Sequence, residues 1–148
     1  ETHLHTCSFP QNDSVYVSSF QYQGTSETSA YLSVPAAINF METHDWEAQR
    51  ARCHDLAKQT RDRVNALTGL PPVSPDSTEY YSMMSTYYIP KDIEQKLREE
   101  FVRRNIVYVM MEHNNHLMMR ISYQAYNSQQ DADRLIETIE DVIKGKVK

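Results

Sequence analysis

The sequence predicts an α+β fold in which helices pack on one face of a small antiparallel sheet. After residue 45 the apolar periodicity changes between helical and strand-like, in the order helix, strand, helix, strand, strand, helix. The last two strand-like segments are joined by a short turn, and such a turn connects antiparallel strands. A chain of 148 residues can bury one sizeable core but not two.

Residues 1–44 do not obviously belong to this layer, and we expect them to form an N-terminal arm and a linking helix, the remnant of a second domain. Val15–Phe20 is rich in β-branched and aromatic residues and predicts a strand. The small and hydroxyl residues of Gly24–Ser29 predict a turn that caps a helical segment reaching about Thr43. Pro35 inside that segment predicts a kink, or a helix that begins near the proline.

Residues 45–148 are expected to form the α+β domain, which begins with a long helix. Asp45 is a suitable N-cap, and Gly69 stands where a left-handed C-cap residue belongs. A proline-rich connector over residues 70–79 follows. The apolar side chains of the helix share one stripe, formed by Trp46, Cys53, Leu56, Ala57, Val64 and Leu67.

The rest of this domain is predicted to contain three strands and two helices. Apolar spacing predicts a helix over 92–104 and a last helix opened by a capping pair, Ser128 and Asp131. Asparagines at 114 and 115 tolerate a tight hairpin turn between the last two strands. The predicted strands are Tyr80–Tyr88, Ile106–Met111 and Leu117–Tyr123.

Composition and charge narrow the classes of function. The net charge of −5 argues against a general nucleic-acid binder, which needs a basic surplus to neutralise phosphates. No apolar run approaches the ~20 residues that span a bilayer, so no membrane partner is expected. The two cysteines, Cys7 and Cys53, are too few for a disulfide framework and favour a reducing cytoplasm. No signal-peptide pattern is visible at the N-terminus. The chain opens on Glu1 with no initiator Met, so we expect a processed or truncated product.

Arg120 is the first candidate for a functional residue. Alternate side chains of a strand point to opposite faces, so Arg120 lies beside Ser122 on the face opposite the main apolar set. A guanidinium held on a strand can bind a carboxylate through two parallel hydrogen bonds. A solvated charge or a structural ion pair fits the same pattern, so the alternation alone leaves the role open.

Gly24 and Thr25 are the second candidate. A hydroxyl and free backbone amides that follow a glycine, at the entrance to a helix, can bind an anion. An ordinary helix cap explains the same residues. Taken alone, the pair does not decide between an anion site and a cap.

Other groupings of reactive residues predict no site. The motifs His3-x-His5 and His113-x-x-His116 have no acidic or cysteine partner spaced to complete a metal centre, so no metal is expected. Cys53 and His54 are adjacent on a helix, where their side chains diverge by ~100° and cannot form a nucleophile–base pair.

Three blocks of this sequence resemble the class V aminotransferases, which depend on pyridoxal 5'-phosphate (PLP). The stretch from Phe20 to Ile38, with its Gly24-Thr25 pair, is similar to the segment that follows the PLP lysine in that family. Residues 45–48 and 67–72 continue the pattern in register, and 120–127 resembles the closing signature. The similarity covers nearly the whole chain. It is greatest to isopenicillin N epimerase-like and cysteine desulfurase-like members.

The resemblance implies a fold and a role for each candidate. The fold would be that of the C-terminal domain of these enzymes, with residues 1–44 left from the large cofactor domain. Gly24 and Thr25 would contact the PLP phosphate, typically that of a partner subunit in a homodimer. Arg120 would bind the α-carboxylate of an amino-acid substrate. Tyr126 and Asn127 would shape the turn beneath that arginine rather than touch substrate.

The sequence departs from the family pattern in two places. Relatives often have Arg-Asp after Gly-Thr, where this chain has Ser26-Glu27, so the substrate class is in doubt. PLP chemistry also needs a lysine that forms a Schiff base, and no lysine precedes Lys58. We therefore expect this chain to be inactive alone, with the lysine in a missing N-terminal large domain.

Two functions remain open. In the first, the chain is the C-terminal portion of a PLP enzyme, epimerase-like by preference, although C–S cleavage and transamination fit equally. In the second, it is a non-catalytic domain that acts as a dimerisation or interaction module, through apolar surfaces such as Ala30–Met41.

Overall fold

The computed structural model describes Ser14 and residues 27–147. The chain divides into two compact units, of which one ends at Thr43 and the other begins at His44. The predicted strand Val15–Phe20 and the Gly24-Thr25 pair lie outside the described residues. Each unit is described by itself.

Two short helices, α2 (Ser29–Leu32) and α3 (Val34–Thr43), form the described part of the first unit. The helical path is interrupted at Ser33, and Pro35 lies in the first turn of α3, where its missing N–H costs no hydrogen bond. The predicted restart near the proline is confirmed. Neither helix has a buried residue in this structure.

The second unit begins with α4 (Trp46–Thr68), and its ends are capped as predicted. The Asp45 carboxylate accepts a hydrogen bond from the Ala48 N–H at 3.3 Å. Gly69 has a left-handed φ of 67°, and its N–H bonds the Asn65 carbonyl. A glycine adopts this conformation without the steric cost that a side chain would bring.

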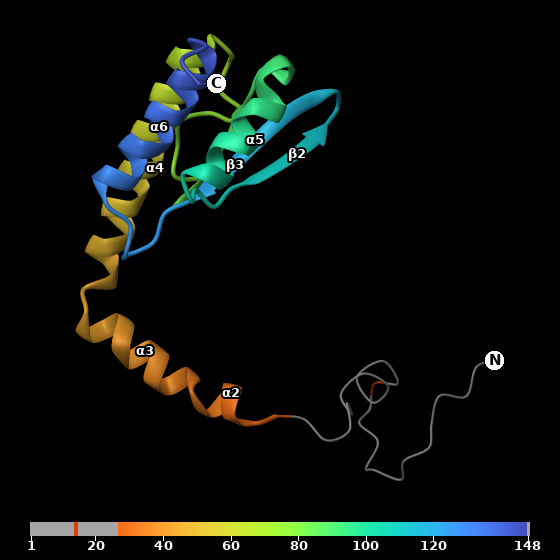
Figure 1. The fold of residues 1–148 in the computed structure, drawn as a ribbon. Coiled ribbons are helices and arrows are strands. Elements are labelled where there is room, and N and C mark those ends of the chain that lie inside the picture. Colours follow the sequence, from red (N-terminus) through yellow and green to blue (C-terminus); the bar gives the residue numbers. More distant parts are fainter. Residues whose placement is uncertain (1–13, 15–26, 148) are drawn as a thin grey trace, which may run out of the picture. The chain divides into compact units, whose positions relative to one another are not determined.

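The sheet has three antiparallel strands in the order β1-β3-β2. Figure 1 shows α4, α5 and α6 together with strands β2 and β3, and this arrangement confirms the predicted α+β fold. Strand β1 is Met84–Tyr88, β2 is Val109–His113 and β3 is His116–Ser122. Asn114 and Asn115 close the hairpin with φ of 48° and 63°, the left-handed pair that a two-residue turn requires. A 3₁₀ turn (Lys91–Ile93) leads into α5 (Glu94–Arg103), and α6 (Gln129–Ile143) ends the domain.

One face of the sheet is buried and the other is open. On the buried face, Tyr87, Met119 and Ile121 pack with α4, α5 and α6 around side chains such as Leu97, Phe101 and Ile139. The open face is made by alternate residues of the same strands, since the side chains of paired residues share a side. Its members are Met84, Thr86, Tyr88, Val109, Met111, His113, His116, Met118, Arg120 and Ser122.

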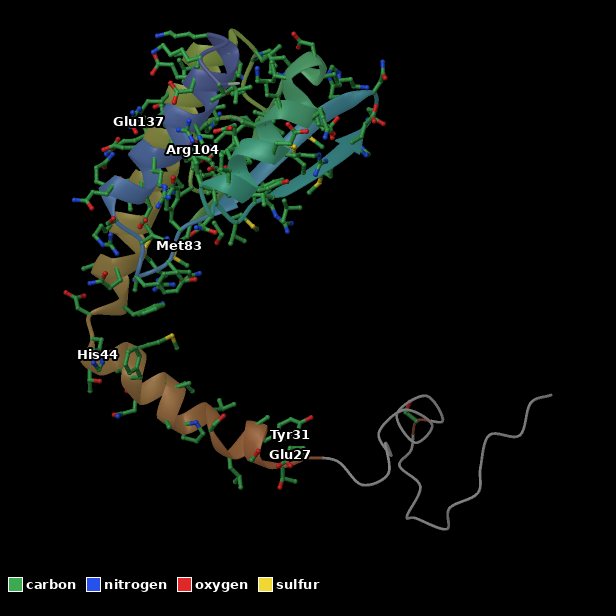
Figure 2. All side chains as sticks on the ribbon, in the orientation of Figure 1. Glu27, Tyr31, His44, Met83, Arg104 and Glu137 are labelled. Carbon is green, nitrogen blue, oxygen red and sulfur yellow. The ribbon has the colours of Figure 1, made fainter. Side chains whose placement is uncertain are left out.

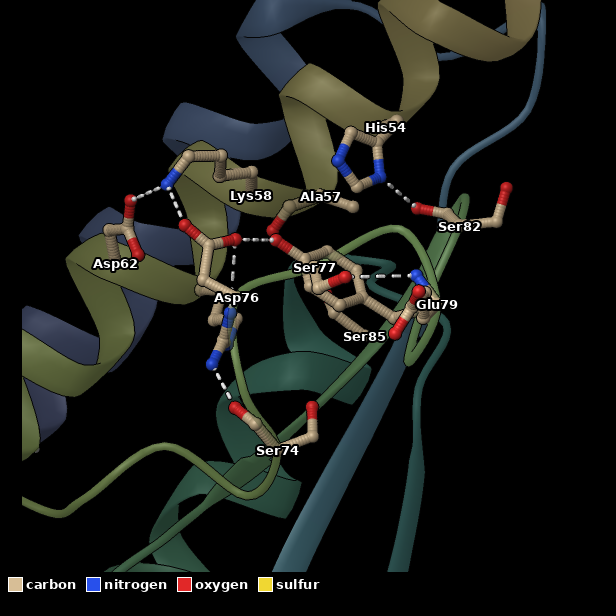
Figure 3. Close-up of polar contacts among 12 residues, drawn as sticks. His54, Ala57, Lys58, Asp62, Ser74, Asp76, Ser77, Glu79, Ser82 and Ser85 are labelled. Carbon is tan, nitrogen blue, oxygen red and sulfur yellow. Dashed lines mark hydrogen bonds and ion pairs between the residues drawn. The ribbon is translucent and has the colours of Figure 1, made fainter.

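Strand β1 is shorter than the predicted strand Tyr80–Tyr88, because polar contacts hold residues 76–81 in a turn (Figure 3). The Tyr81 hydroxyl donates to Asp76 Oδ1 at 2.6 Å, and the Tyr81 N–H bonds the Ser77 carbonyl. Strand β2 likewise begins at Val109 rather than at Ile106. In both cases the apolar pattern begins several residues before the backbone pairing starts.

The connector between α4 and β1 is fastened to α4 through Asp76 (Figure 3). Its carboxylate accepts from Lys58 Nζ at 2.6 Å and lies 3.3 Å from Arg61 Nη1. Arg61 is buried, donates to the Ser74 carbonyl, and has its guanidinium 5.1 Å from the centre of the Tyr81 ring. The ion pair with Asp76 and the hydrogen bond of Nη2 offset the cost of burying this charge, while Nε and Nη1 have no hydrogen-bond partner among the described residues.

Helices α5 and α6 are joined by Arg104, which follows α5 (Figure 2). Its guanidinium donates to Glu100 Oε2, Thr138 Oγ1 and Asp141 Oδ2 at 2.8–3.2 Å. Each of the bonds to a carboxylate is charge-assisted and therefore stronger than a neutral pair. These contacts fix α6 against the helix that precedes β2.

Replacement of Ile139 by alanine should destabilise the second unit by about 2–5 kcal/mol, because the side chain is fully buried in the core. Ile143 lies one turn later on the same helix and is 37% exposed, so Ile143→Ala is the matched control and should cost less than about 1 kcal/mol. Urea denaturation followed by circular dichroism measures both. Equal losses for the two variants would contradict the assigned packing of α6.

Candidate functional site

Arg120 lies at the centre of the open face of the sheet. It is paired with Thr86 of β1 on one side and with Val109 of β2 on the other. Its side chain is partly buried, and among the described residues it makes no hydrogen bond or ion pair. The strand holds the backbone on both sides, while the guanidinium keeps all of its donors available.

An open cavity of about 480 Å³ adjoins Arg120. Strand β2 begins opposite Arg120, so beyond this point β3 is paired with β1 alone. The gap is bordered by residues 105–109 on one side and by the end of β3, the following turn and the start of α6 on the other. The cavity is thus a consequence of unequal strand lengths.

The first wall of the cavity diverges from the sheet for a local reason. Asn105, after α5, has a left-handed φ of 54°, and the Ile106 N–H bonds the Phe101 carbonyl at 2.8 Å. This closes the helix and redirects the chain. Tyr108 then packs its ring 4.8 Å from that of Phe101, which keeps the wall close to the core.

The turn between β3 and α6 is held from two directions. Asn127 Oδ1 accepts the Gln124 N–H at 2.8 Å, so Asn127 shapes this turn, as the family resemblance implies. Arg52 of α4 donates to the carbonyls of Ala125 and Asn127, both at 2.9 Å. Tyr126 is 84% exposed and lines the cavity instead. Sequence reasoning missed Arg52, because its partners lie more than seventy positions away along the chain.

The start of α6 contributes two charged residues to the cavity, Asp131 and Arg134. Asp131 Oδ2 accepts from the Ser128 N–H at 2.8 Å and from its hydroxyl at 3.1 Å. The hydrogen bond from the Ser128 backbone is the main reason that the pKa of this carboxyl lies below its usual value. The predicted pairing of Ser128 with Asp131 at the helix start is confirmed.

The other candidate reactive residues are buried or contact neighbouring parts of the same domain. Cys53 is a buried free thiol, and the His54 Nδ1 lies 3.0 Å from the Ser82 carbonyl while its ring stacks on Tyr81. His113 and His116 are opposite each other at the hairpin. Within residues 27–147, no three His, Cys, Asp or Glu side chains form a group that could hold a metal ion.

In the same part of the chain, no helix has the length and apolar character needed to cross a membrane.

The sequence matches the aminotransferase class V family over residues 2–135, nearly the full chain. This chain belongs to the class V aminotransferase family. The resemblance of the three sequence blocks is thereby confirmed at the level of the family.

Two further comparisons concern one sequence relative and one fold. An isopenicillin N epimerase from Amycolatopsis lactamdurans is 27% identical over 124 residues, covering 82% of this chain and 31% of that protein. The chain therefore spans about a third of the length of this class V relative. The solved structure of 8-amino-7-oxononanoate synthase from Francisella tularensis has a TM-score of 0.57 at 16% identity, covering 75% of this chain and 32% of the synthase. At that identity the likeness is one of fold.

Neither Lys58 nor the lining of the cavity beside Arg120 supplies a lysine suited to a Schiff base. Lys58 Nζ is bonded to Asp76 and Asp62, and these bonds, that of Asp76 first, hold the pKa of the ammonium above its usual range. A protonated amine is not a nucleophile. The residues that line the cavity beside Arg120, within the described part, include no lysine.

Arg52→Ala should loosen the turn beneath Arg120, because two carbonyls lose a charged donor. We expect a loss of about 1 kcal/mol in unfolding free energy and faster amide exchange at Asn127. Arg50 lies on the same helix, is exposed and makes no hydrogen bond or ion pair with this turn among the described residues, so Arg50→Ala is the control. Hydrogen exchange followed by NMR measures amide protection in both variants. Identical protection at Asn127 in the two would contradict the role of Arg52 in holding this turn.

The contribution of Asp131 to stability should depend on pH. Because folding lowers its pKa below the ordinary value of 3.8, the ionised carboxylate stabilises the fold above that pH, and the contribution disappears as pH falls through the folded value. Asp131→Asn should therefore lower the melting temperature at neutral pH, and the difference from the unmodified chain should shrink below about pH 4. Melting curves between pH 7 and pH 3 test this. A difference that stays constant across this range would show that the charge is not involved.

Proposed function

We propose that this chain is the C-terminal portion of a PLP-dependent class V enzyme that acts on an amino acid, with epimerisation as the favoured reaction. The observation that carries the proposal is the free guanidinium of Arg120, fixed on a doubly paired strand beside an open cavity. The family resemblance assigns the α-carboxylate of the substrate to this position. The epimerase relative supports the favoured reaction.

Arg120 is suited to a carboxylate for three physical reasons. The planar fork of a guanidinium matches the two oxygens of a carboxylate. Thr86 and Val109, its paired neighbours, carry no charge that would compete for it. The partly buried setting reduces solvent screening, which strengthens an ion pair relative to one at a fully exposed site. The role of Arg120 is thus to bind and orient the substrate.

Gly24 and Thr25 are proposed to contact the phosphate of PLP. Both lie outside the described residues, so the support is the Gly-Thr motif and its position before a helical segment. When bound, PLP supplies the electron sink for chemistry at the α-carbon of an amino acid. Its covalent attachment belongs to a lysine outside this chain, and the chain is inactive alone. The catalytic step is therefore carried by the large domain.

The proposed partners are a large domain and a second copy of the enzyme. Support comes from α2 and α3, which carry several exposed apolar side chains. These include Tyr31, Leu32, Val34, Ile38 and Met41. An apolar set of this size on one helical segment is typical of a surface that is buried in an assembly. The free, buried thiol of Cys53 agrees with a cytoplasmic enzyme.

The same exposed helices favour the alternative of a non-catalytic dimerisation module. The two functions differ in what Arg120 does. A dimerisation module needs the apolar helix surface but has no use for a free guanidinium on the sheet, whereas the enzyme needs both.

In the complete enzyme, Arg120→Lys should weaken substrate binding by about 1.5–3 kcal/mol, because an ammonium cannot replace the two-pronged bond to a carboxylate. Steady-state kinetics with the amino-acid substrate measure the loss, and Arg50→Lys is the control. Unchanged kinetics for Arg120→Lys would remove the assigned role.

The reaction type is tested with the complete enzyme in D₂O. Epimerisation exchanges the α-hydrogen for deuterium and inverts the configuration, which proton NMR and chiral chromatography detect. Release of sulfide or of a 2-oxo acid without inversion would instead indicate C–S cleavage or transamination and would contradict the favoured reaction.

A further inference from the structure

The cavity beside Arg120 contains a second guanidinium, that of Arg134. Arg134 lies in the second turn of α6 and is exposed. Among the described residues its side chain, like that of Arg120, has no hydrogen bond or ion pair. Two guanidinium groups on different elements, both without a partner in this part of the chain, thus line one cavity.

Asp131 forms no hydrogen bond or ion pair with Arg120 or Arg134. It is the one carboxylate among the described residues that line the cavity, and its Oδ2 is already engaged by the N–H and hydroxyl of Ser128. Its charge offsets part of the field of Arg134, one turn further along the helix, without a direct bond. The cavity therefore keeps an excess of positive charge, which favours an anionic ligand.

The wall opposite the charges is apolar. Residues 106–109 read Ile-Val-Tyr-Val, and within this run Val107 is 93% exposed and Val109 is 41% exposed. Exposed aliphatic side chains next to two cations suit a ligand with a hydrocarbon spacer between charged ends. A ligand with a single anionic group would leave one guanidinium unpaired.

We propose that Arg134 selects a substrate whose side chain ends in a second anionic group, such as a carboxylate. This inference rests on the proposed function of Arg120, which binds the α-carboxylate. Arg134 binds the distal anion, and the methylene groups between the two lie along residues 106–109. Arg134 is thus a specificity-determining residue, and the substrate class is that of acidic amino acids with an aliphatic spacer.

The test uses the whole ¹⁵N-labelled chain and two probes, glutarate and pentanoate. Both have five carbons, and they differ in a second carboxylate that replaces a methyl group. Amide and arginine Nε shifts give the dissociation constant of each. We expect glutarate to bind about threefold to fivefold more tightly than pentanoate, the gain of one exposed ion pair. Arg134→Gln should abolish this preference and leave pentanoate binding unchanged.

Two further variants separate this inference from the proposed function. Arg120→Gln should weaken both probes, and Arg50→Gln should affect neither. If Arg134→Gln keeps the preference, or weakens both probes equally, the selective role of Arg134 is wrong, although that of Arg120 stands. If Arg120→Gln changes neither probe, or if neither probe gives a saturable shift, the carboxylate site itself is wrong. Preserved amide dispersion in each variant shows that the fold is intact.

Discussion

The alternation of side chains along β3 is the constraint on which the site depends. Leu117, Met119 and Ile121 are buried against the helices, so the residues between them must face the other way. Arg120 is therefore fixed on the open face by the burial of its neighbours rather than by any contact of its own. The energy that positions the guanidinium comes from apolar packing on the opposite side of the sheet.

The cavity depends on a second constraint, the different lengths of the strands that flank β3. Strand β1 pairs with β3 as far as Ser122, whereas β2 pairs only as far as Arg120. Asn105 and the closing turn of α5 set where β2 begins, and Arg52 fixes the turn on the other side. Contacts made by α4 and at the end of α5 thus determine the shape of a cavity that neither helix lines.

Local features of the fold could be predicted from the sequence, and features that depend on distant contacts could not. Asp45 and Gly69 cap their helix through neighbours a few positions away, and the turn asparagines need only their own backbone preference. The face of Arg120 follows from alternation. The start of β2 was wrong by three residues, because Ile106 and Tyr108 are apolar enough for a strand yet pack beside the core without pairing. The contacts of Arg52 and the approach of α6 to the cavity join distant segments, so no local pattern indicates them. The proposed roles of Gly24 and Thr25 stay predictions.

The open face of the sheet also has a chemical consequence. Met84, Met111 and Met118 share that face with the arginine, and Met84 is 47% exposed. Thioethers are flexible and polarisable, so they can fit closely against a partner surface without a fixed shape of their own. Oxidation to the sulfoxide makes the same side chains polar and chiral. An oxidant that reached this surface would therefore make the open face more polar and weaken apolar contacts with a partner. The helices and the core on the other side of the sheet would be unchanged.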